Sequence, residues 1–156
     1  MAEVRQVAGI TVCKYDGPGE IESGKQGQLF GLRAGLLGVG IQAISTTGGD
    51  TNLHSHPGTE EIWIVLRGKA SFYGMNDAFV AGIGPAEGVS VPKGVPYWFE
   101  NTGDELLEIY RIAVKDPSIP NAERTNYAPF TEAQITRGFG HGRMATEEER
   151  KAAAAL

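Results

Sequence analysis

Two of the three histidines in this 156-residue chain, His54 and His56, lie one residue apart, and Glu60 and Glu61 follow closely. Side chains alternate between the two faces of an extended strand, so the imidazoles of His54 and His56 point to the same side. Glu61 opens the next apolar segment and shares a face with Trp63, whereas Glu60 points to the opposite side. Two neutral imidazoles and one carboxylate form the facial triad of non-haem Fe(II) enzymes, which leaves positions open for substrate or oxygen. The spacing therefore predicts that His54, His56 and Glu61 bind one metal ion.

This donor set does not select the ion by itself. Fe²⁺ is the preferred ion, and Mn²⁺, Ni²⁺, Co²⁺, Zn²⁺ and Cu²⁺ accept the same nitrogen and oxygen ligands. A second interpretation stays open, because a surface histidine pair and adjacent glutamates also occur on ordinary solvated faces.

The elements that must position these side chains are short strands. Runs rich in Val, Ile, Phe, Tyr and Trp alternate with glycine-containing turns such as TGGD (47–50) and NTGD (101–104). This pattern predicts an all-β, antiparallel sandwich or barrel. The predicted strand segments are residues 9–15, 38–45, 61–68, 69–74, 88–92, 97–101 and 105–114.

The composition changes after residue 115. Residues 116–130 carry three prolines and are expected to form an extended connection, and residues 131–134 are expected to begin a short helical turn. Residues 145–156 are predicted to form a helix, because Thr146 and Glu149 have the spacing of a capping box. We therefore expect a β-barrel over residues 1–115 and a C-terminal extension over residues 116–156 within the same domain.

Two motifs resemble those of one protein family. Residues Gly48 to Gly68 follow the pattern G-x5-H-x-H-x4-E-x6-G, and PKGVPYWFEN (92–101) is similar to P-x-G-x2-H-x3-N. Together they resemble the two motifs of the cupin superfamily over roughly residues 35 to 114. The resemblance implies a double-stranded β-helix (jelly-roll) barrel, usually a homodimer, with a metal ion inside the barrel. It also implies that His54, His56 and Glu61 are the first three metal ligands.

The chain departs from the family at Tyr97, which stands where the fourth ligand is usually histidine. Three roles stay open for this residue. Tyr97 binds the metal as a phenolate, or it stands outside the coordination shell and donates a hydrogen bond or a proton to the substrate, or it packs beside a weakened or empty site.

Four further residues are candidates for substrate binding. By strand parity, Trp63 and Phe99 are expected to line the interior of the barrel, near Glu61 and Tyr97 respectively. Arg67 and Arg111 lie on predicted strands and are candidates to contact a substrate carboxylate. Each has an ordinary alternative, a core position for the aromatic residues and an exposed strand position for the arginines.

Composition and charge exclude several functional classes. The net charge is −5 without a long run of one sign, which argues against nucleic acid and anionic membrane surfaces as partners. The central apolar run IWIVL is too short to span a bilayer, and no signal peptide is expected. Cys13 is the single cysteine, so no disulfide within the chain is expected and a reducing, cytoplasmic setting is predicted.

The preferred functional hypothesis is a metal-dependent cupin enzyme that acts on a small polar organic substrate. Fe(II)-dependent oxygenase chemistry, as in a dioxygenase, is favoured by the open positions of the triad. Two alternatives remain. One is a non-redox, metal-dependent isomerase, lyase or decarboxylase, and the other is a non-catalytic cupin that binds a small ligand.

Overall fold

The computed structural model describes the whole chain except residues 1, 22–23, 25, 48, 121 and 137–140. The larger sheet of the described residues has five strands in the order β3-β4-β11-β6-β9, and all neighbours are antiparallel. These strands are β3 (Gln26–Ala34), β4 (Leu37–Ile44), β11 (Leu107–Lys115), β6 (Thr59–Arg67) and β9 (Gly88–Val91).

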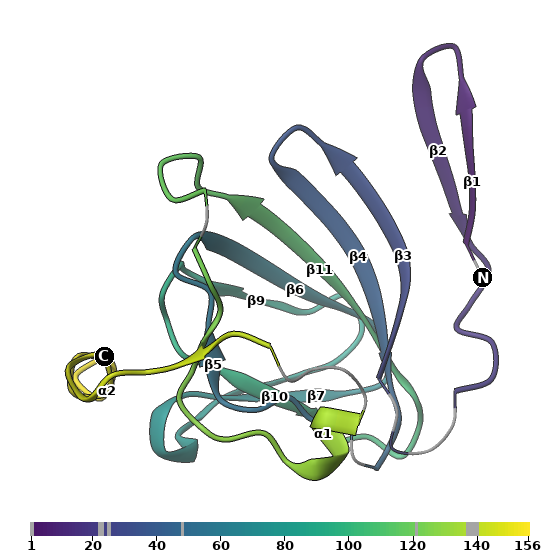
Figure 1. Cartoon of the computed structure of the whole chain (residues 1–156). Coiled ribbons are helices and arrows are strands. Elements are labelled where there is room, and N and C mark those ends of the chain that lie inside the picture. The colour runs from purple at the N-terminus through teal and green to yellow at the C-terminus, as the bar shows by residue number, and fades with distance from the viewer. Residues whose placement is uncertain (1, 22–23, 25, 48, 121, 137–140) are drawn as a thin grey trace.

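A second wall faces this sheet across the core (Figure 1). Half of it is the sheet of β10 (Trp98–Asn101), β7 (Ala70–Tyr73) and β8 (Phe79–Ile83), with the short 3-10 helix η1 (Met75–Asp77) between β7 and β8. The other half is the sheet of β13 (Arg143–Met144), β12 (Thr125–Asn126) and β5 (His54–Ser55). A β-bridge between His54 and Tyr97 joins the halves through backbone hydrogen bonds of 3.1 and 2.9 Å. The expected all-β double-stranded β-helix is confirmed.

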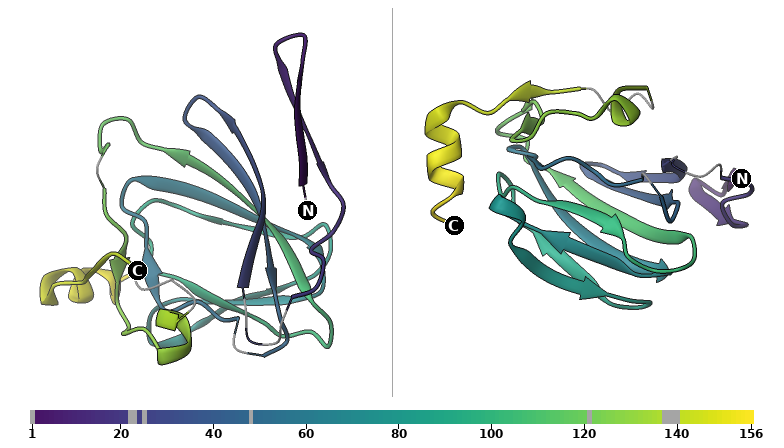
Figure 2. Two further views of the ribbon diagram at one scale, coloured as in Figure 1. Left: turned by 45° about the vertical axis from the view of Figure 1, so that its right-hand side comes forward. Right: turned by 90° about the horizontal axis from the view of Figure 1, so that it is seen from below.

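Segments at both ends of the chain lie outside the two walls. The hairpin of β1 (Ala2–Val7) and β2 (Ile10–Tyr15) stands beside β3 at one edge of the barrel (Figure 1). The C-terminal extension contains the short helices α1 (Glu132–Thr136) and α2 (Glu147–Ala153), and α2 projects from the opposite side (Figure 2). The capping box of Thr146 and Glu149 is present at the start of α2, as predicted.

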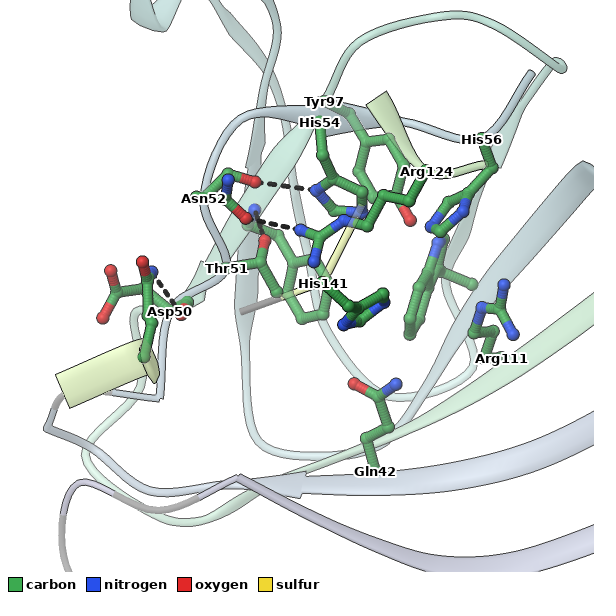
Figure 3. Close-up of a pocket in the computed structure, with 13 residues that line it drawn as sticks. Gln42, Asp50, Thr51, Asn52, His54, His56, Tyr97, Arg111, Arg124 and His141 are labelled. Carbon is green, nitrogen blue, oxygen red and sulfur yellow. Dashed lines mark hydrogen bonds between the residues drawn. The ribbon is translucent and has the colours of Figure 1, made fainter. Parts of the chain in front are cut away.

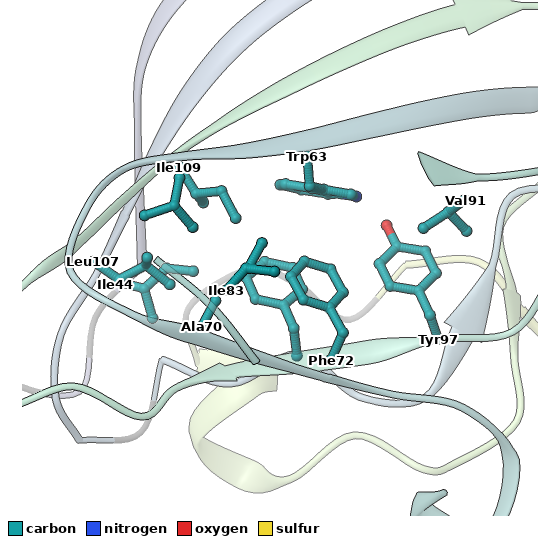
Figure 4. Packing of buried hydrophobic residues seen from close by; sticks show 11 residues of the cluster. Ile44, Trp63, Ala70, Phe72, Ile83, Val91, Tyr97, Leu107 and Ile109 are labelled. Atoms are coloured by element: carbon teal, nitrogen blue, oxygen red, sulfur yellow. The ribbon is translucent and has the colours of Figure 1, made fainter. Parts of the chain in front are cut away.

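The core lies between the walls and follows the predicted alternation. Trp63 and Val65 of β6 are buried, whereas their neighbours Ile62 and Leu66 are exposed. Aromatic rings, among them those of Trp63, Phe72 and Tyr97, fill the centre (Figure 4). The rings of Phe72 and Phe99 are stacked, with their centroids 4.9 Å apart. The main buried cluster consists of Ile44, Trp63, Val65, Ala70, Phe72, Ile83, Val91, Tyr97, Phe99, Leu107 and Ile109.

Every predicted strand segment coincides with a strand, namely β2, β4, β6, β7, β9, β10 or β11. Among the described residues, sequence analysis missed six strands: β1, β3, β5, β8, β12 and β13. Three of them, β5, β12 and β13, contain only two residues each, whereas β1 and β3 contain six and nine. In β8 the large apolar residues Phe79 and Val80 are adjacent and both exposed, so the strand has no alternation of buried and exposed positions there. Gly48 of the first motif lies outside the described residues.

Replacement of Gly68 by alanine is expected to destabilise the barrel more than the same change at Gly94. Both glycines have positive φ values, +83° and +80°, which alone cost alanine about 1–2 kcal/mol. A Cβ atom at Gly68 would also meet the carbonyl oxygen of Leu106 at 2.9 Å, whereas nothing lies within 4 Å at Gly94. Urea unfolding should give a loss of about 2–4 kcal/mol for Gly68→Ala, and equal losses for both variants would contradict this packing.

Candidate functional site

A cavity of about 210 Å³ lies between the two walls and next to the C-terminal extension (Figure 3). A cavity of this volume suits a small ligand. It is lined by Gln42, Asp50, Thr51, Asn52, His54, His56, Trp63, Tyr97, Phe99, Arg111, Arg124, Gln134 and His141.

His54 is buried on β5 and is held in one tautomer. Its Nδ1 lies 2.7 Å from the backbone oxygen of Asn52, and because a carbonyl only accepts, Nδ1 carries the proton. Burial lowers the pKa of the His54 imidazole well below its usual value, and Arg124 and His56 lower it further. His54 is therefore neutral at physiological pH, and Nε2 keeps its lone pair.

His56 follows β5, and its ring lies 5.0 Å from that of His54 in an edge-to-face arrangement. Burial lowers the pKa of His56 to about 4, although the nearby Glu61 carboxylate acts in the opposite direction. Two neutral imidazoles therefore meet at the cavity, in the protonation state that metal binding requires.

The carboxylate of Glu61 is buried on β6 and bonded at both oxygens. Oε2 accepts a hydrogen bond of 2.5 Å from the Tyr97 hydroxyl. Oε1 accepts from Arg111 Nε at 2.6 Å and also from Arg111 Nη2. The strand register explains the ion pair: Arg111 of β11 lies opposite Trp63, two residues along β6 from Glu61.

Tyr97 immediately precedes β10, on the wall opposite Glu61. Burial raises the pKa of the Tyr97 phenol well above its usual value, and the carboxylate of Glu61 raises it further. The side chain is therefore a neutral hydrogen-bond donor in this arrangement, and its bond to Glu61 crosses the interior of the barrel.

The residues fit a metal ion in part. The imidazoles of His54 and His56 have the right protonation and line the cavity. Glu61 is not among the lining residues, and its Oε1 lies 3.8 Å from His56 Nε2 and is already paired with Arg111. Among the described residues, no three His, Cys, Asp or Glu side chains gather closely enough to hold an ion. The structure therefore brings the two predicted imidazoles to the cavity, whereas the carboxylate of the predicted third ligand is engaged by a guanidinium.

The structure brings three of the four predicted substrate-contacting residues to the cavity: Trp63, Phe99 and Arg111. It does not bring Arg67 there, which corrects the expectation for that residue. A β-bulge lies between the Val65–Ile109 pair and the Arg67–Glu108 pair, and the extra residue turns Arg67 to the outer face. Arg67 there forms ion pairs with Glu108 at 3.3 Å and Glu105 at 3.4 Å.

Sequence analysis missed Asn52 and Arg124. Asn52 accepts a hydrogen bond from His54 through its backbone oxygen and from Arg124 Nη2 through its side-chain oxygen. Its position two residues before His54 is a usable signal, because alternate residues share a face. Arg124 lies in the proline-containing segment after the barrel and carried no such signal.

The profile of the cupin domain family matches residues 43–113. No curated protein matches the chain with significance. Among the described residues, no helix has both the length and the apolar character needed to cross a membrane.

Solved structures of low sequence identity share the fold. An uncharacterised conserved protein with a double-stranded β-helix domain from Klebsiella pneumoniae has a TM-score of 0.57 and 17% identity, over 69% of this chain and 83% of that one. The cupin domain of Schizosaccharomyces pombe Cnp3 has a TM-score of 0.53 and 16% identity, over 77% and 90%. A cupin superfamily protein from Desulfitobacterium hafniense has a TM-score of 0.53 and 13% identity, over 62% and 84%. Residues 43–113 of this chain therefore match the cupin domain family, and the chain shares the double-stranded β-helix fold of these structures.

Replacement of Tyr97 by phenylalanine is expected to reduce the free energy of unfolding by about 1–3 kcal/mol, because a buried acceptor loses its donor. Tyr73→Phe is the matched control, since the Tyr73 hydroxyl also donates to a carboxylate, Glu100 Oε1 at 2.9 Å, but near the surface. Chemical denaturation of both variants measures the difference. Similar losses in the two variants would contradict a special role for the bond across the barrel.

The histidine pair predicts acid sensitivity of the metal-free protein. In the folded protein His56 has a pKa of about 4, below the ordinary value of 6.5. Between pH 4 and pH 6.5 the unfolded chain therefore binds a proton at this residue more readily than the folded chain does. The contribution of His56 to stability is therefore complete above pH 6.5 and falls by about 3 kcal/mol as the pH falls to 4. Urea unfolding from pH 4 to 7.5 should show a shallower pH dependence for His56→Gln, and parallel curves would contradict the assignment.

Proposed function

We propose that this protein is a metal-dependent cupin enzyme that acts on a small polar organic substrate in the barrel cavity. The observation that carries this proposal is the pair of neutral imidazoles, His54 and His56, on the cavity wall. His54 and His56 would hold the ion, and Glu61 would complete the triad where Arg111 releases its Oε1. The ion would supply Lewis-acid or redox chemistry at this point.

The other side chains would bind and orient the substrate. Trp63 and Phe99 form an apolar wall that excludes water from one side of the cavity. The Tyr97 hydroxyl donates a hydrogen bond to Glu61 and so holds the carboxylate in place. Tyr97 is also the candidate acid/base group for the substrate. The hydrogen bond of Tyr97 to Glu61 is compatible with the second of its three open roles, in which the phenol stands outside the coordination shell and one more coordination position stays free.

Fe(II)-dependent oxygenation, as in a dioxygenase, is the preferred reaction type because it needs two free coordination positions. A non-redox isomerase, lyase or decarboxylase would use the same residues with Zn²⁺, Mn²⁺ or Ni²⁺. A second candidate function, metal-free binding of a small ligand, is favoured by the Arg111–Glu61 ion pair, which already neutralises the third ligand. The homodimer and the cytoplasmic setting stay predictions.

Metal analysis of the untagged protein tests the proposal. The expected result is about one ion per chain, with affinity at least tenfold weaker in His54→Gln. His141→Gln is the control, because His141 lines the same cavity but is exposed and belongs to the extension. Iron together with substrate-dependent oxygen uptake supports an oxygenase, and tightly bound zinc or manganese without uptake supports non-redox chemistry. No stoichiometric metal after reconstitution, or unchanged metal in His54→Gln, would overturn the proposal in favour of metal-free binding.

A further inference from the structure

An arginine from the C-terminal extension lies at the cavity beside the histidine pair. Arg124 immediately precedes β12, whose Thr125 pairs with Ser55 of β5, and it lines the cavity (Figure 3). This position lies beyond residues 43–113, which the cupin profile matches. Its Nη2 donates to Asn52 Oδ1, and the centroid of the Phe130 ring lies 5.3 Å from the guanidinium carbon. Burial lowers the pKa of Arg124 to about 10, which leaves it charged at neutral pH.

Two guanidiniums line the cavity beside the histidines. Arg111 is paired with Glu61, which is not among the lining residues, and Arg124 donates to the neutral side chain of Asn52. Among the described lining residues the one carboxylate is that of Asp50, which lies at the far side of the cavity from Arg111 (Figure 3). A metal ion would add further positive charge, so an anionic ligand suits the cavity with or without metal.

The indole N–H group of Trp63, on the cavity wall, is a further hydrogen-bond donor that a ligand could use. The side chain of Trp63 is 3% exposed, and its indole Nε1 makes no hydrogen bond of normal geometry with the described residues. Its N–H end is turned toward the hydroxyl of Tyr97 (Figure 4). Buried N–H groups in folded proteins have acceptors as a rule, and a ligand oxygen in the cavity would be an acceptor beside the Tyr97 hydroxyl.

We infer that the ligand of this cavity is a small organic carboxylate, bound through the guanidinium of Arg124 beside the Arg111–Glu61 ion pair. This inference names the substrate class of the proposed function and rests on the same cavity. A guanidinium binds a carboxylate through paired, charge-assisted hydrogen bonds. The apolar faces of Trp63 and Phe99 contact the carbon body of the ligand, which favours an organic acid over inorganic phosphate. The volume of about 210 Å³ restricts the ligand to a small acid.

Fluorescence of Trp63 gives a direct measure of cavity occupancy. The chain has two tryptophans, and Trp98 donates to Asp77 at the surface, so Trp98→Phe leaves Trp63 as the only tryptophan. In this background, protein freed of metal on a chelating resin is titrated with carboxylates of three to six carbon atoms. Each acid is compared with its uncharged amide, and inorganic phosphate is titrated separately. We expect at least one carboxylate to change Trp63 emission saturably, at least tenfold more tightly than its amide.

Two arginine variants then test whether Arg124 binds the carboxylate. Arg124→Gln keeps an amide donor for Asn52 but removes the charge, and we expect it to weaken carboxylate binding at least tenfold with an unchanged melting temperature. Arg67→Gln is the matched control, because Arg67 lies on the outer face, and it should bind as the parent does. If Arg124→Gln does not fold, the comparison of acid with amide in the parent decides alone.

Three results would overturn the inference: no carboxylate preferred over its amide, equal binding by Arg124→Gln and Arg67→Gln, or binding of phosphate without any carboxylate. The titration uses metal-free protein and no turnover. Its outcome is therefore distinguishable from failure of the proposed metal-dependent function.

Discussion

The buried carboxylate of Glu61 is the constraint on which the interior of this barrel depends. A carboxylate removed from water costs several kcal/mol unless it is paired and hydrogen-bonded. Glu61 meets that requirement with partners from both walls, the Arg111 guanidinium on β11 and the Tyr97 hydroxyl before β10. The same three side chains therefore connect the two sheets and form the polar end of an otherwise aromatic and aliphatic core.

This arrangement sets the chemistry of the neighbouring cavity. Burial keeps His54 neutral, and the charges of Arg124 and Arg111 act in the same direction. The backbone carbonyl of Asn52 fixes its tautomer, a role that carbonyls and carboxylates often have beside metal-binding histidines. The cavity thus combines two neutral nitrogen donors with the guanidinium of Arg124, a combination suited to an anionic ligand beside a metal ion.

The C-terminal extension is part of this site. Arg124, Gln134 and His141 come from residues beyond the segment that the cupin profile matches, yet they form one side of the cavity. Gln134 is anchored there by its side-chain donation to the backbone oxygen of Asp50 at 3.2 Å. Cupins share a barrel and differ in activity, so residues added outside the common fold are well placed to determine which ligand enters.

The local sequence pattern alone determined which strand residues are buried, where the histidine pair lies and where helix α2 begins. Strand alternation placed Trp63, Val65 and Phe99 inside, the spacing of His54 and His56 put both imidazoles on the cavity wall, and the capping box of α2 followed from four residues of sequence. Only the tertiary structure decided the rest. The bulge that turns Arg67 outward depends on the register between β6 and β11, and the Arg111–Glu61 pair depends on the same register. The approach of Arg124 to His54 depends on the return of the chain across the barrel through β12. These contacts join residues about 40 to 70 positions apart, and strand periodicity carries no information on which distant strands will lie side by side.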